Sequence, residues 1–288
     1  MRTANVNGRL AVLRTGGYFD VATASAGRFD SDPMVAFEAW RDLRAWEASA
    51  EFGEPIPVAE VVLKCPVPRP PQVFGIGLNY RTHAIESGLP IPDVPLVFTK
   101  FPSSVGDPDG ELTIPTAQTD WEVELAVVIG STAYEIDRAD AWDYVAGVTV
   151  AQDFSARDVQ FTPAGTPQFS LGKSFPGFLP LGPVVVTTDE LTDRNAIPLW
   201  CDIDGVRVQD GNTSDLVFSV PALIEYLSSI LPLGPGDVIL TGTPSGVGIG
   251  RKPPVYLAPG QSIETGSPEI GIMHHRSRRA PNPWSWAP

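Results

Sequence analysis

The sequence predicts a β-rich α+β protein, and three observations favour this fold class. Its 288 residues include 30 prolines and 27 glycines, a content typical of short elements joined by many turns. Most of the chain after residue 73 consists of apolar runs of strand length that are bounded by turn residues. Helical spacing of apolar residues occurs in two stretches, 34–51 and 219–231, which argues against a helical bundle.

The first 70 residues predict a small module of their own. Residues 1–30 alternate in polarity, and their Asn-Gly and Gly-Gly pairs are typical of hairpins. A helix is expected over 34–51, followed by a proline-rich stretch, 66–71, typical of a linker. We therefore expect a small N-terminal module over residues 1–70 and a main domain over residues 71–288.

The main domain is expected to consist mostly of strands. The helix over 219–231 has Ser219 as its expected cap and Pro221 in its first turn. The basic tail from His274 onward predicts a surface extension. The expected strands are VFGIGLNY (73–80), LVFTKF (96–101), ELAVVIGS (124–131), YVAGVTVAQDF (144–154), LGPVVVTT (181–188), LWCDIDGVRV (199–208) and GDVILTGTP (236–244).

Charge and cysteine content narrow the classes of function. A formal net charge of −14 repels phosphate backbones and anionic lipids, so neither nucleic acid nor a membrane is an expected partner. The cysteines, Cys65 and Cys201, lie far apart and have no metal-like spacing, which fits a reducing compartment. The sequence has no apolar segment of signal-peptide or membrane-span length, and we expect a cytoplasmic protein.

Three carboxylates suggest a metal site. Glu122 and Glu124 are two residues apart on a predicted strand, so they point to the same face, and Asp153 ends another apolar strand. Oxygen ligands of this kind suit Mg²⁺, or else Mn²⁺ or Ca²⁺, and leave positions for water and a chelating substrate. The alternative is an exposed strand face, because spacing alone does not show that the strands meet.

His83 and Glu86 form a candidate acid–base pair. At a spacing of three residues they meet if the segment is one helical turn, and the carboxylate then orients the imidazole and raises its basicity. The alternative is a chance pair on a surface helix. Arg157 and Gln160 follow Asp153 by four and seven residues, so a helical turn would place all three on one side.

Five segments in order resemble the fumarylacetoacetate hydrolase family, from about residue 73 to 250 and more loosely to 271. They are GLNYRTHAIESG (77–88), DWEVELAVVIG (120–130), AQDFSARDVQ (151–160), LGKSF (171–175) and LTGTPSGVG (240–248). The resemblance implies a mixed β-sheet roll, a homodimer and a divalent metal held by Glu122, Glu124 and Asp153. Gln152 and Pro176 depart from the usual family residues, which weakens assignment to a subfamily.

The resemblance also implies roles around the metal. His83 and Glu86 would lie on a lid that orders over substrate and assembles the base. Lys173 would neutralise the carboxylates and donate a hydrogen bond to a metal-bound water. The alternative is an ordinary lysine on the surface. For Arg157 the alternative to substrate binding is a purely structural ion pair. For the segment that contains Thr243 the alternative is a tight turn with no role in binding. The residues expected to bind substrate are Arg157, Gln160, Thr243 and Tyr80.

These residues lead to three hypotheses of function. The first is metal-dependent hydrolysis of a carbon–carbon bond in an acylpyruvate-like 2,4-dioxo acid, a small-molecule 2-oxo acid. The second uses the same site as a decarboxylase of oxaloacetate-like acids or an isomerase of 2-hydroxy-dienedioates. The third is a catalytically silent metal-binding scaffold, which would have no need of His83, Glu86 and Lys173. Phe161, Phe169 and Phe175 are candidates for the far end of the substrate pocket.

Overall fold

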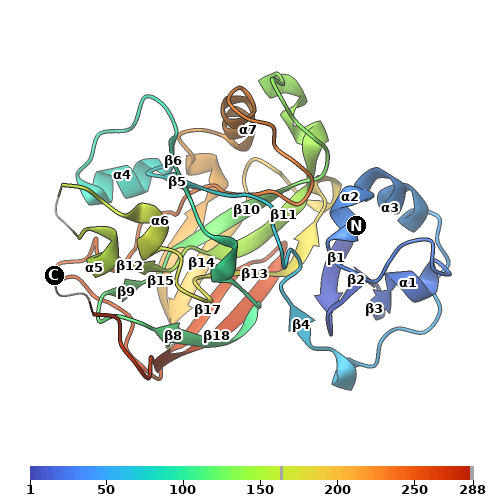
Figure 1. Ribbon diagram of the computed structural model, residues 1–288, viewed down its shortest axis with the longest axis horizontal. Helices are drawn as coiled ribbons and strands as arrows, with labels where there is room; N and C mark the ends of the chain where they lie inside the picture. Colours follow the sequence, from blue (N-terminus) through green and yellow to red (C-terminus); the bar gives the residue numbers. More distant parts are fainter. Residues whose placement is uncertain (163–164, 286–288) are drawn as a thin grey trace.

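The computed structural model of the chain describes residues 1–162 and 165–285 and confirms a β-rich α+β fold with few helices. Its strands form an 11-stranded sheet, a five-stranded sheet and a two-stranded pair (Figure 1). No helix in these ranges is long and apolar enough to cross a membrane.

The 11-stranded sheet carries the site. Its order is β3-β2-β1-β13-β11-β10-β16-β5-β6, with β4 added on β1 and β7 on β13. Both β10 and β11 are buried along their whole length, because both faces of the sheet are covered at this point. Its strands are β1 (Arg2–Val6), β2 (Arg9–Arg14), β3 (Gly17–Asp20), β4 (Leu63–Lys64), β5 (Val73–Gly77), β6 (Leu96–Thr99), β7 (Val105–Gly106), β10 (Val123–Ile129), β11 (Val145–Gln152), β13 (Leu179–Val186) and β16 (Val238–Leu240).

The smaller sheet packs on one face of the larger one. Its order is β15-β14-β17-β18-β8, and the short pair β12-β9 lies beside it. Leu125 and Val127 of β10 share one core with Cys201 and Met273 of the smaller sheet. The strands are β8 (Asp109–Ile114), β9 (Thr119–Asp120), β12 (Ser155–Ala156), β14 (Pro198–Ile203), β15 (Val206–Asn212), β17 (Ser262–Ser267) and β18 (Gly271–Arg279).

The opposite face of β10 belongs to a second core. Ala126 and Val128, which alternate with Leu125 and Val127, pack there with residues of the N-terminal region. Glu122 and Glu124 have the same parity as Ala126, so the pleat directs their side chains to this second face. The alternation along this buried strand thus places the two glutamates on the face opposite the core that β10 shares with the smaller sheet.

The predicted N-terminal hairpins are confirmed, and they continue the large sheet. β1 pairs with β13 through Arg2 opposite Val186 and Thr3 opposite Val185. Figure 1 shows β1–β3 and α1–α3 together at one end of the molecule. The boundary at residue 70 stays a prediction. The predicted helix over 34–51 is interrupted, because Ala39 leaves helical geometry while the rings of Phe37 and Trp40 stack across the break.

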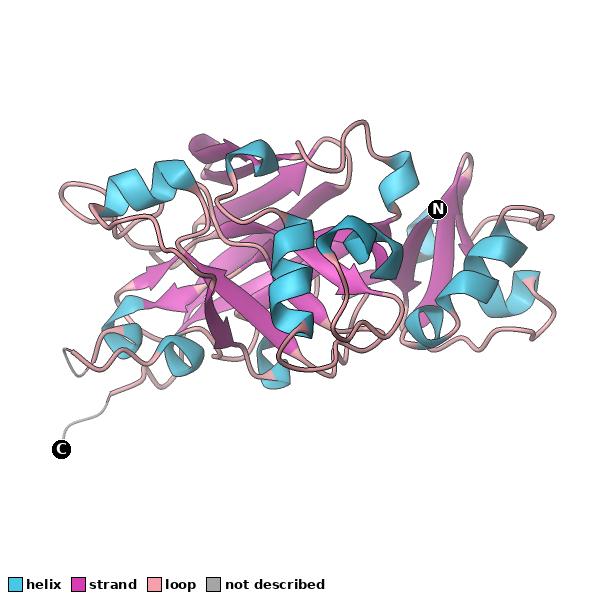
Figure 2. Ribbon diagram, turned by 90° about the horizontal axis from the view of Figure 1, so that it is seen from above, coloured by secondary structure: helices cyan, strands magenta, loops and turns pink. Residues whose placement is uncertain are grey.

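Most of the α-helices lie in two groups at opposite ends of the molecule, and α7 lies between them (Figure 1). Figure 1 shows α4, α5 and α6 grouped at the end opposite the N-terminal region, and Figure 2 shows how helices surround the strands. The α-helices are α1 (Val21–Ala24), α2 (Val35–Glu38), α3 (Trp40–Glu47), α4 (Arg81–Ser87), α5 (Arg157–Gln160), α6 (Phe169–Gly172) and α7 (Val220–Ser228). The 3-10 turns are Val58–Glu60, Pro102–Ser104, Arg138–Tyr144, Thr188–Glu190 and Thr213–Asp215.

One local expectation is confirmed and one is wrong. α7 begins as predicted, with Ser219 at its N-cap position and its proline in the first turn, although the Ser219 side chain makes no capping hydrogen bond. The basic tail is not a surface extension as far as Arg279, because β18 pairs with both β17 and β8. His275 and Ser277 are buried and alternate with exposed basic residues. Because these two buried residues are polar, the sequence does not show the alternation of apolar and polar residues that is typical of a strand. The end of that tail, 286–288, lies outside the described residues.

Candidate active site

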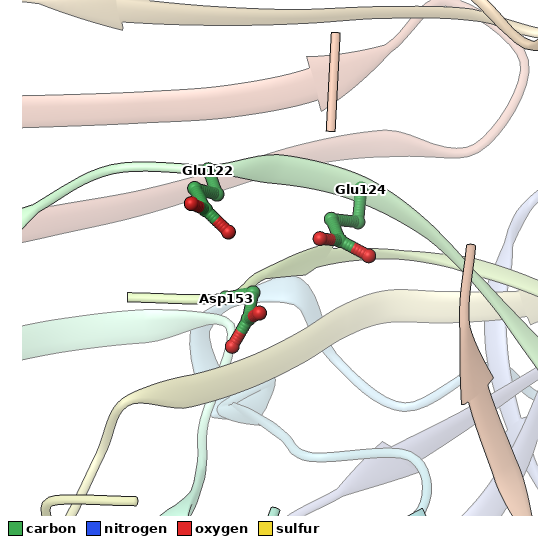
Figure 3. Close-up of side chains that lie close together, drawn as sticks. All are labelled: Glu122, Glu124 and Asp153. Atoms are coloured by element: carbon green, nitrogen blue, oxygen red, sulfur yellow. The ribbon is translucent and has the colours of Figure 1, made fainter. Parts of the chain in front are cut away.

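The three predicted metal ligands meet because β10 and β11 are antiparallel. Val123 lies opposite Gln152 and Glu124 opposite Ala151, so the next pair outward is Glu122 with Asp153. The Asp153 amide donates to the Glu122 carbonyl oxygen at 2.9 Å, which confirms that pairing. One carboxylate oxygen from each residue lies within 4.8 Å of the others (Figure 3). All three side chains are buried, so the alternative of an exposed strand face is wrong.

Three buried cations surround this cluster. Lys173 Nζ lies 2.6 Å from Glu122 Oε2 and 2.6 Å from Asp153 Oδ2, so its ammonium group bridges two of the carboxylates. Lys100 Nζ lies 2.7 Å from Asp153 Oδ1 and also donates to the carbonyl oxygens of Lys173 and Phe178. A surface lysine is therefore excluded for position 173.

Arg157 holds Glu122 from the other side. Its Nη2 lies 2.6 Å from Glu122 Oε1, its Nε donates to Asp120 Oδ2 at 2.9 Å, and its Nη1 donates to Gln160 Oε1 at 2.9 Å. The ion pair is thus with Asp120 and Glu122 rather than with Asp158. Asp120 also accepts from the Gly248 amide at 2.7 Å, which ties this arginine to the loop after β16.

Lys100 and Asp120 were missed from the sequence, although both left a signal. Lys100 is a lone charge in the apolar run LVFTKF, and Asp120 begins the segment that contains the two glutamates. Both side chains are fully buried, so each needs a partner of opposite charge. A lone charge in an apolar strand therefore indicates a buried ion pair. It does not indicate which carboxylate is the partner.

The electrostatics single out Glu124. Burial would raise the pKa of Glu122, but Lys173 and Arg157 outweigh it and lower that pKa. Burial and the nearby charges of Asp153 and Glu122 raise the pKa of Glu124 well above its ordinary value. Glu124 has no ion pair among the described residues, and its Oε2 accepts from the Gly242 amide at 2.7 Å.

The donor set fits a hard divalent cation. Carboxylate oxygens from three buried residues converge, and the Glu124 carboxylate makes no ion pair with a cationic side chain among the described residues. Lys100, Lys173 and Arg157 balance the charges of Asp153, Glu122 and Asp120, so the negative charge of an ionised Glu124 would be left over. A divalent cation would favour the ionised form of Glu124, which burial alone disfavours.

His83 and Glu86 form the expected pair on one helical turn. Both lie on α4, and His83 Nδ1 is 3.2 Å from Glu86 Oε2. Glu86 also accepts from the Gly246 amide at 3.0 Å, so α4 is docked on the loop that follows β16. The pair is half-buried rather than free on a surface.

A cavity of about 170 Å³ joins these groups. Tyr80 and Glu86 do not line it; Tyr80 is fully buried, with no hydrogen-bond partner for its hydroxyl among the described residues. Phe175 lies elsewhere, while Phe161 and Phe169 do line the cavity as expected. The predicted site residues on its wall are His83, Glu122, Glu124, Asp153, Arg157, Gln160, Lys173 and Thr243.

The substrate-binding candidates differ in how they reach the cavity. Arg157 and Gln160 lie on α5, but Asp153 does not share their helical turn, because Ser155–Ala156 is a strand that pairs with β9. Thr243 Oγ1 donates to the Val123 carbonyl oxygen at 2.8 Å, which fastens the loop after β16 to the strand between the two glutamates. Whether these residues and Tyr80 contact substrate stays a prediction.

Comparison with known proteins identifies relatives of this chain. The sequence profile described as fumarylacetoacetate (FAA) hydrolase C-terminal matches residues 72–277. A protein of Burkholderia lata named as a hydrolase is 50% identical over 211 residues, or 72% of this chain and 74% of that protein. The human mitochondrial oxaloacetate tautomerase FAHD2A is 45% identical over 220 residues, or 76% of this chain and 70% of the relative.

Solved structures agree over nearly the whole chain. A Mycobacterium smegmatis protein assigned as HpcE is 46% identical with a TM-score of 0.92, covering 97% of this chain and 100% of that one. A Mycobacterium abscessus protein assigned as 2-hydroxyhepta-2,4-diene-1,7-dioate isomerase is 32% identical with a TM-score of 0.82, covering 97% and 98%. The maleylpyruvate hydrolase of Sphingobium sp. SYK-6, with manganese(II) and pyruvate bound, is 27% identical with a TM-score of 0.79, covering 97% and 100%.

The matched segment includes both strands that carry the carboxylates, the helix with the His–Glu pair and the loop after β16. Relatives with this fold are named as hydrolases, isomerases and a tautomerase. Because the family profile matches most of the chain and the relatives are this similar in sequence, the chain belongs to the fumarylacetoacetate hydrolase family of enzymes.

Proposed function

We propose that this protein hydrolyses a carbon–carbon bond in an acylpyruvate-like 2,4-dioxo acid with the help of a divalent metal ion. The observation that carries the proposal is one cavity lined both by a buried three-carboxylate cluster and by a histidine paired with a glutamate. The carboxylates are suitable ligands for a cation that chelates the 2-oxo acid, and the histidine is a suitable base to activate water.

The carboxylates of Glu122, Glu124 and Asp153 would hold the metal, which supplies Lewis-acid polarisation of the 2-oxo acid when bound. Lys100, Lys173 and Arg157 fix the orientation of two of these carboxylates through short ion pairs. Such supporting contacts pre-organise a site, because the side chains need not be ordered when the ligand arrives.

His83 would act as the general base. Because Nδ1 is hydrogen-bonded to Glu86, Nε2 is the nitrogen that takes a proton from water. The water oxygen bonds to the C4 carbonyl carbon, the C3–C4 bond breaks, and its electron pair passes to C3 as the enolate of pyruvate. The proton then returns from the histidine to C3, and the products are a carboxylic acid and pyruvate.

Positive side chains would lie beside the enolate. Lys173 and Arg157 line the cavity beside the carboxylate cluster, and both are held in place by ion pairs. Fixed charges of this kind stabilise a developing anion without the cost of reorientation during the reaction. Burial would lower the pKa of Lys173, but Asp153 and Glu122 raise it, so the residue stays cationic.

A second candidate uses the same groups without cleavage. The human relative is named as an oxaloacetate tautomerase and a structural relative as a dioate isomerase, so proton transfer between carbon and oxygen of a 2-oxo acid is the leading alternative. Decarboxylation of oxaloacetate-like acids would also use a stabilised enolate. Product analysis separates the three: two acid fragments, an isomer, or carbon dioxide.

Turnover of acetylpyruvate before and after removal of metal tests the proposal. Hydrolysis should yield equal amounts of acetate and pyruvate, disappear on exhaustive treatment with EDTA, and return when Mg²⁺ or Mn²⁺ is added in excess. The metal role is wrong if hydrolysis survives complete chelation. The hydrolase assignment is wrong if oxaloacetate tautomerises rapidly while acetylpyruvate stays intact.

A further inference from the structure

The cavity is lined by aromatic side chains as well as by charged ones. Phe98 of β6, Phe161 after α5 and Phe169 of α6 all line it, although they come from three separate segments. The rings of Phe98 and Phe169 stack with centroids 6.0 Å apart, and Phe161 meets Phe169 edge-on at 6.0 Å. Building on the function proposed above, we propose that the substrate carries a short, uncharged apolar group at the end away from its 2-oxo acid.

The large sheet itself builds this apolar wall. Gly75 and Gly77 of β5 lie opposite Phe98 and Leu96 of β6. A Cβ at Gly75 would come within 2.3 Å of the Phe98 ring, and one at Gly77 within 2.7 Å of Leu96. The two glycines therefore let both apolar side chains lie flat across β5, where each also lines the cavity.

The cations on the cavity wall are already paired with carboxylates, and the Lys173 ammonium group lies over the Phe98 ring, 5.2 Å from its centroid. The lysine and arginine side chains on the cavity wall, within the described residues, are Lys173 and Arg157. Each of them already binds Glu122, and they pair further with Asp153 and Asp120. A second carboxylate on the substrate would thus lose water beside aromatic rings without gaining a cationic partner, which is unfavourable.

The size of the cavity limits the apolar group. Its volume of about 170 Å³ is small beside the roughly 300–1,000 Å³ of pockets for drug-sized ligands. The mouth is apolar as well, since Leu89 and Phe161 line it with 51% and 43% of their surfaces exposed. A chain of a few carbons would pack on the rings, whereas a long or charged one would extend into solvent.

A matched pair of substrates tests this inference. The first is 2,4-dioxoheptanedioate, which ends in a carboxylate, and the second is 7-methyl-2,4-dioxooctanoate, which has an isopropyl group of similar shape in its place. We expect kcat/KM to favour the isopropyl compound by at least about tenfold, the effect of one unpaired charge worth about 1.4 kcal/mol. Because the two substrates have identical 2,4-dioxo acid groups, the ratio of their kcat/KM values reports the effect of the group at the far end alone.

Binding without turnover separates this inference from the proposed function. In the presence of Mn²⁺, 5-methyl-2-oxohexanoate should raise the melting temperature at lower concentration than 2-oxoglutarate, its carboxylate-ended counterpart. Equal or better binding and turnover of the diacids would overturn the inference and leave the proposed hydrolysis intact. If neither 2-oxo acid binds and neither dioxo acid is cleaved, both the inference and the proposed function are wrong.

A charge placed at the apolar mouth should reverse the preference. Leu89→Arg puts a cation on the cavity wall at a half-exposed position, and it should improve the diacid relative to the isopropyl compound by about tenfold. Leu171→Arg is the matched control, because Leu171 is similarly exposed on neighbouring α6 but does not line the cavity. The same shift in both variants would show a general effect of charge and contradict a specific apolar wall.

Discussion

The charged and aromatic parts of the cavity wall are built in different ways. At the carboxylate end, the side chains lie on or directly next to β10 and β11, strands buried along their whole length, and each carboxylate is fixed by short polar contacts. The aromatic end is assembled from β6, α5 and α6, where Phe161 and Leu96 are substantially exposed. Groups that need exact placement thus lie on the rigid centre of the sheet, and those that only need to be apolar lie at its edge.

This difference has a consequence for substitutions. A change at the carboxylate end removes a charge from a closely spaced network, so its effect on chemistry should be large and insensitive to the substrate's far end. A change at the aromatic end alters the area available for packing, so its effect should be modest and depend on the substrate. Substitutions in each part of the cavity wall test this contrast.

The largest effect is expected for Glu124→Gln. The amide can still accept from Gly242, and no cation loses its partner, since Glu124 has none among the described residues. Mn²⁺ affinity should fall at least about 100-fold, and turnover should fall with it. The ion-free protein should unfold at the same or a higher temperature, because repulsion from Glu122 and Asp153 is relieved.

Asp153→Asn is the matched comparison for that prediction. It should also weaken metal binding, but it leaves Lys100 and Lys173 buried without a full partner. The free energy of unfolding should therefore decrease by about 3–5 kcal/mol. Calorimetric titration with Mn²⁺ and thermal unfolding of both variants check the pair. If both variants unfold like the unaltered protein, the account of the cation network is wrong.

His83→Asn should slow hydrolysis by roughly 100- to 10,000-fold, the usual contribution of a general base. Metal affinity should change little, because His83 makes no hydrogen bond to the three carboxylates within the described chain. Steady-state kinetics at saturating Mg²⁺, with the Mn²⁺ titration repeated on the variant, measure both. A variant that retains most of its activity would assign the base to another group.

Gly75→Ala should have a smaller effect that depends on the substrate. The new methyl group would press on the Phe98 ring and narrow the apolar end, since its Cβ would lie only 2.3 Å from that ring. We expect KM for 7-methyl-2,4-dioxooctanoate to rise about tenfold while KM for acetylpyruvate changes less. Gly53→Ala is the control, because a Cβ there meets no atom within 4 Å. A uniform loss for both substrates would contradict the role assigned to Phe98.

The smallest effect concerns a residue outside the cavity. Burial lowers the pKa of His275, although its hydrogen bond to the Asp107 carbonyl oxygen partly opposes this. Folding therefore favours the neutral ring, and stability is complete above the unfolded pKa of about 6.5 and decreases as the pH falls through it. His275→Gln should weaken this acid sensitivity in denaturant titrations between about pH 7 and 5.

The sequence predicted most of the strands and part of the site for clear physical reasons. The two-residue period of a strand correctly placed Glu122 and Glu124 on one face. Their meeting with Asp153 depends on the register of β10 with β11, which no spacing within either strand encodes. Lys100 was missed because its partners are 53 and 73 residues away, and only the fold brings them together.

The most direct test of the central claim is anomalous diffraction from crystals soaked in Mn²⁺. We expect a single strong anomalous peak, with carboxylate oxygens of Glu122, Glu124 and Asp153 about 2.0–2.2 Å from the metal ion. Lys173 should still be hydrogen-bonded to Glu122 or Asp153. A peak elsewhere, or no peak while the Lys173 ammonium group keeps the three carboxylates closed, would contradict the metal-dependent account.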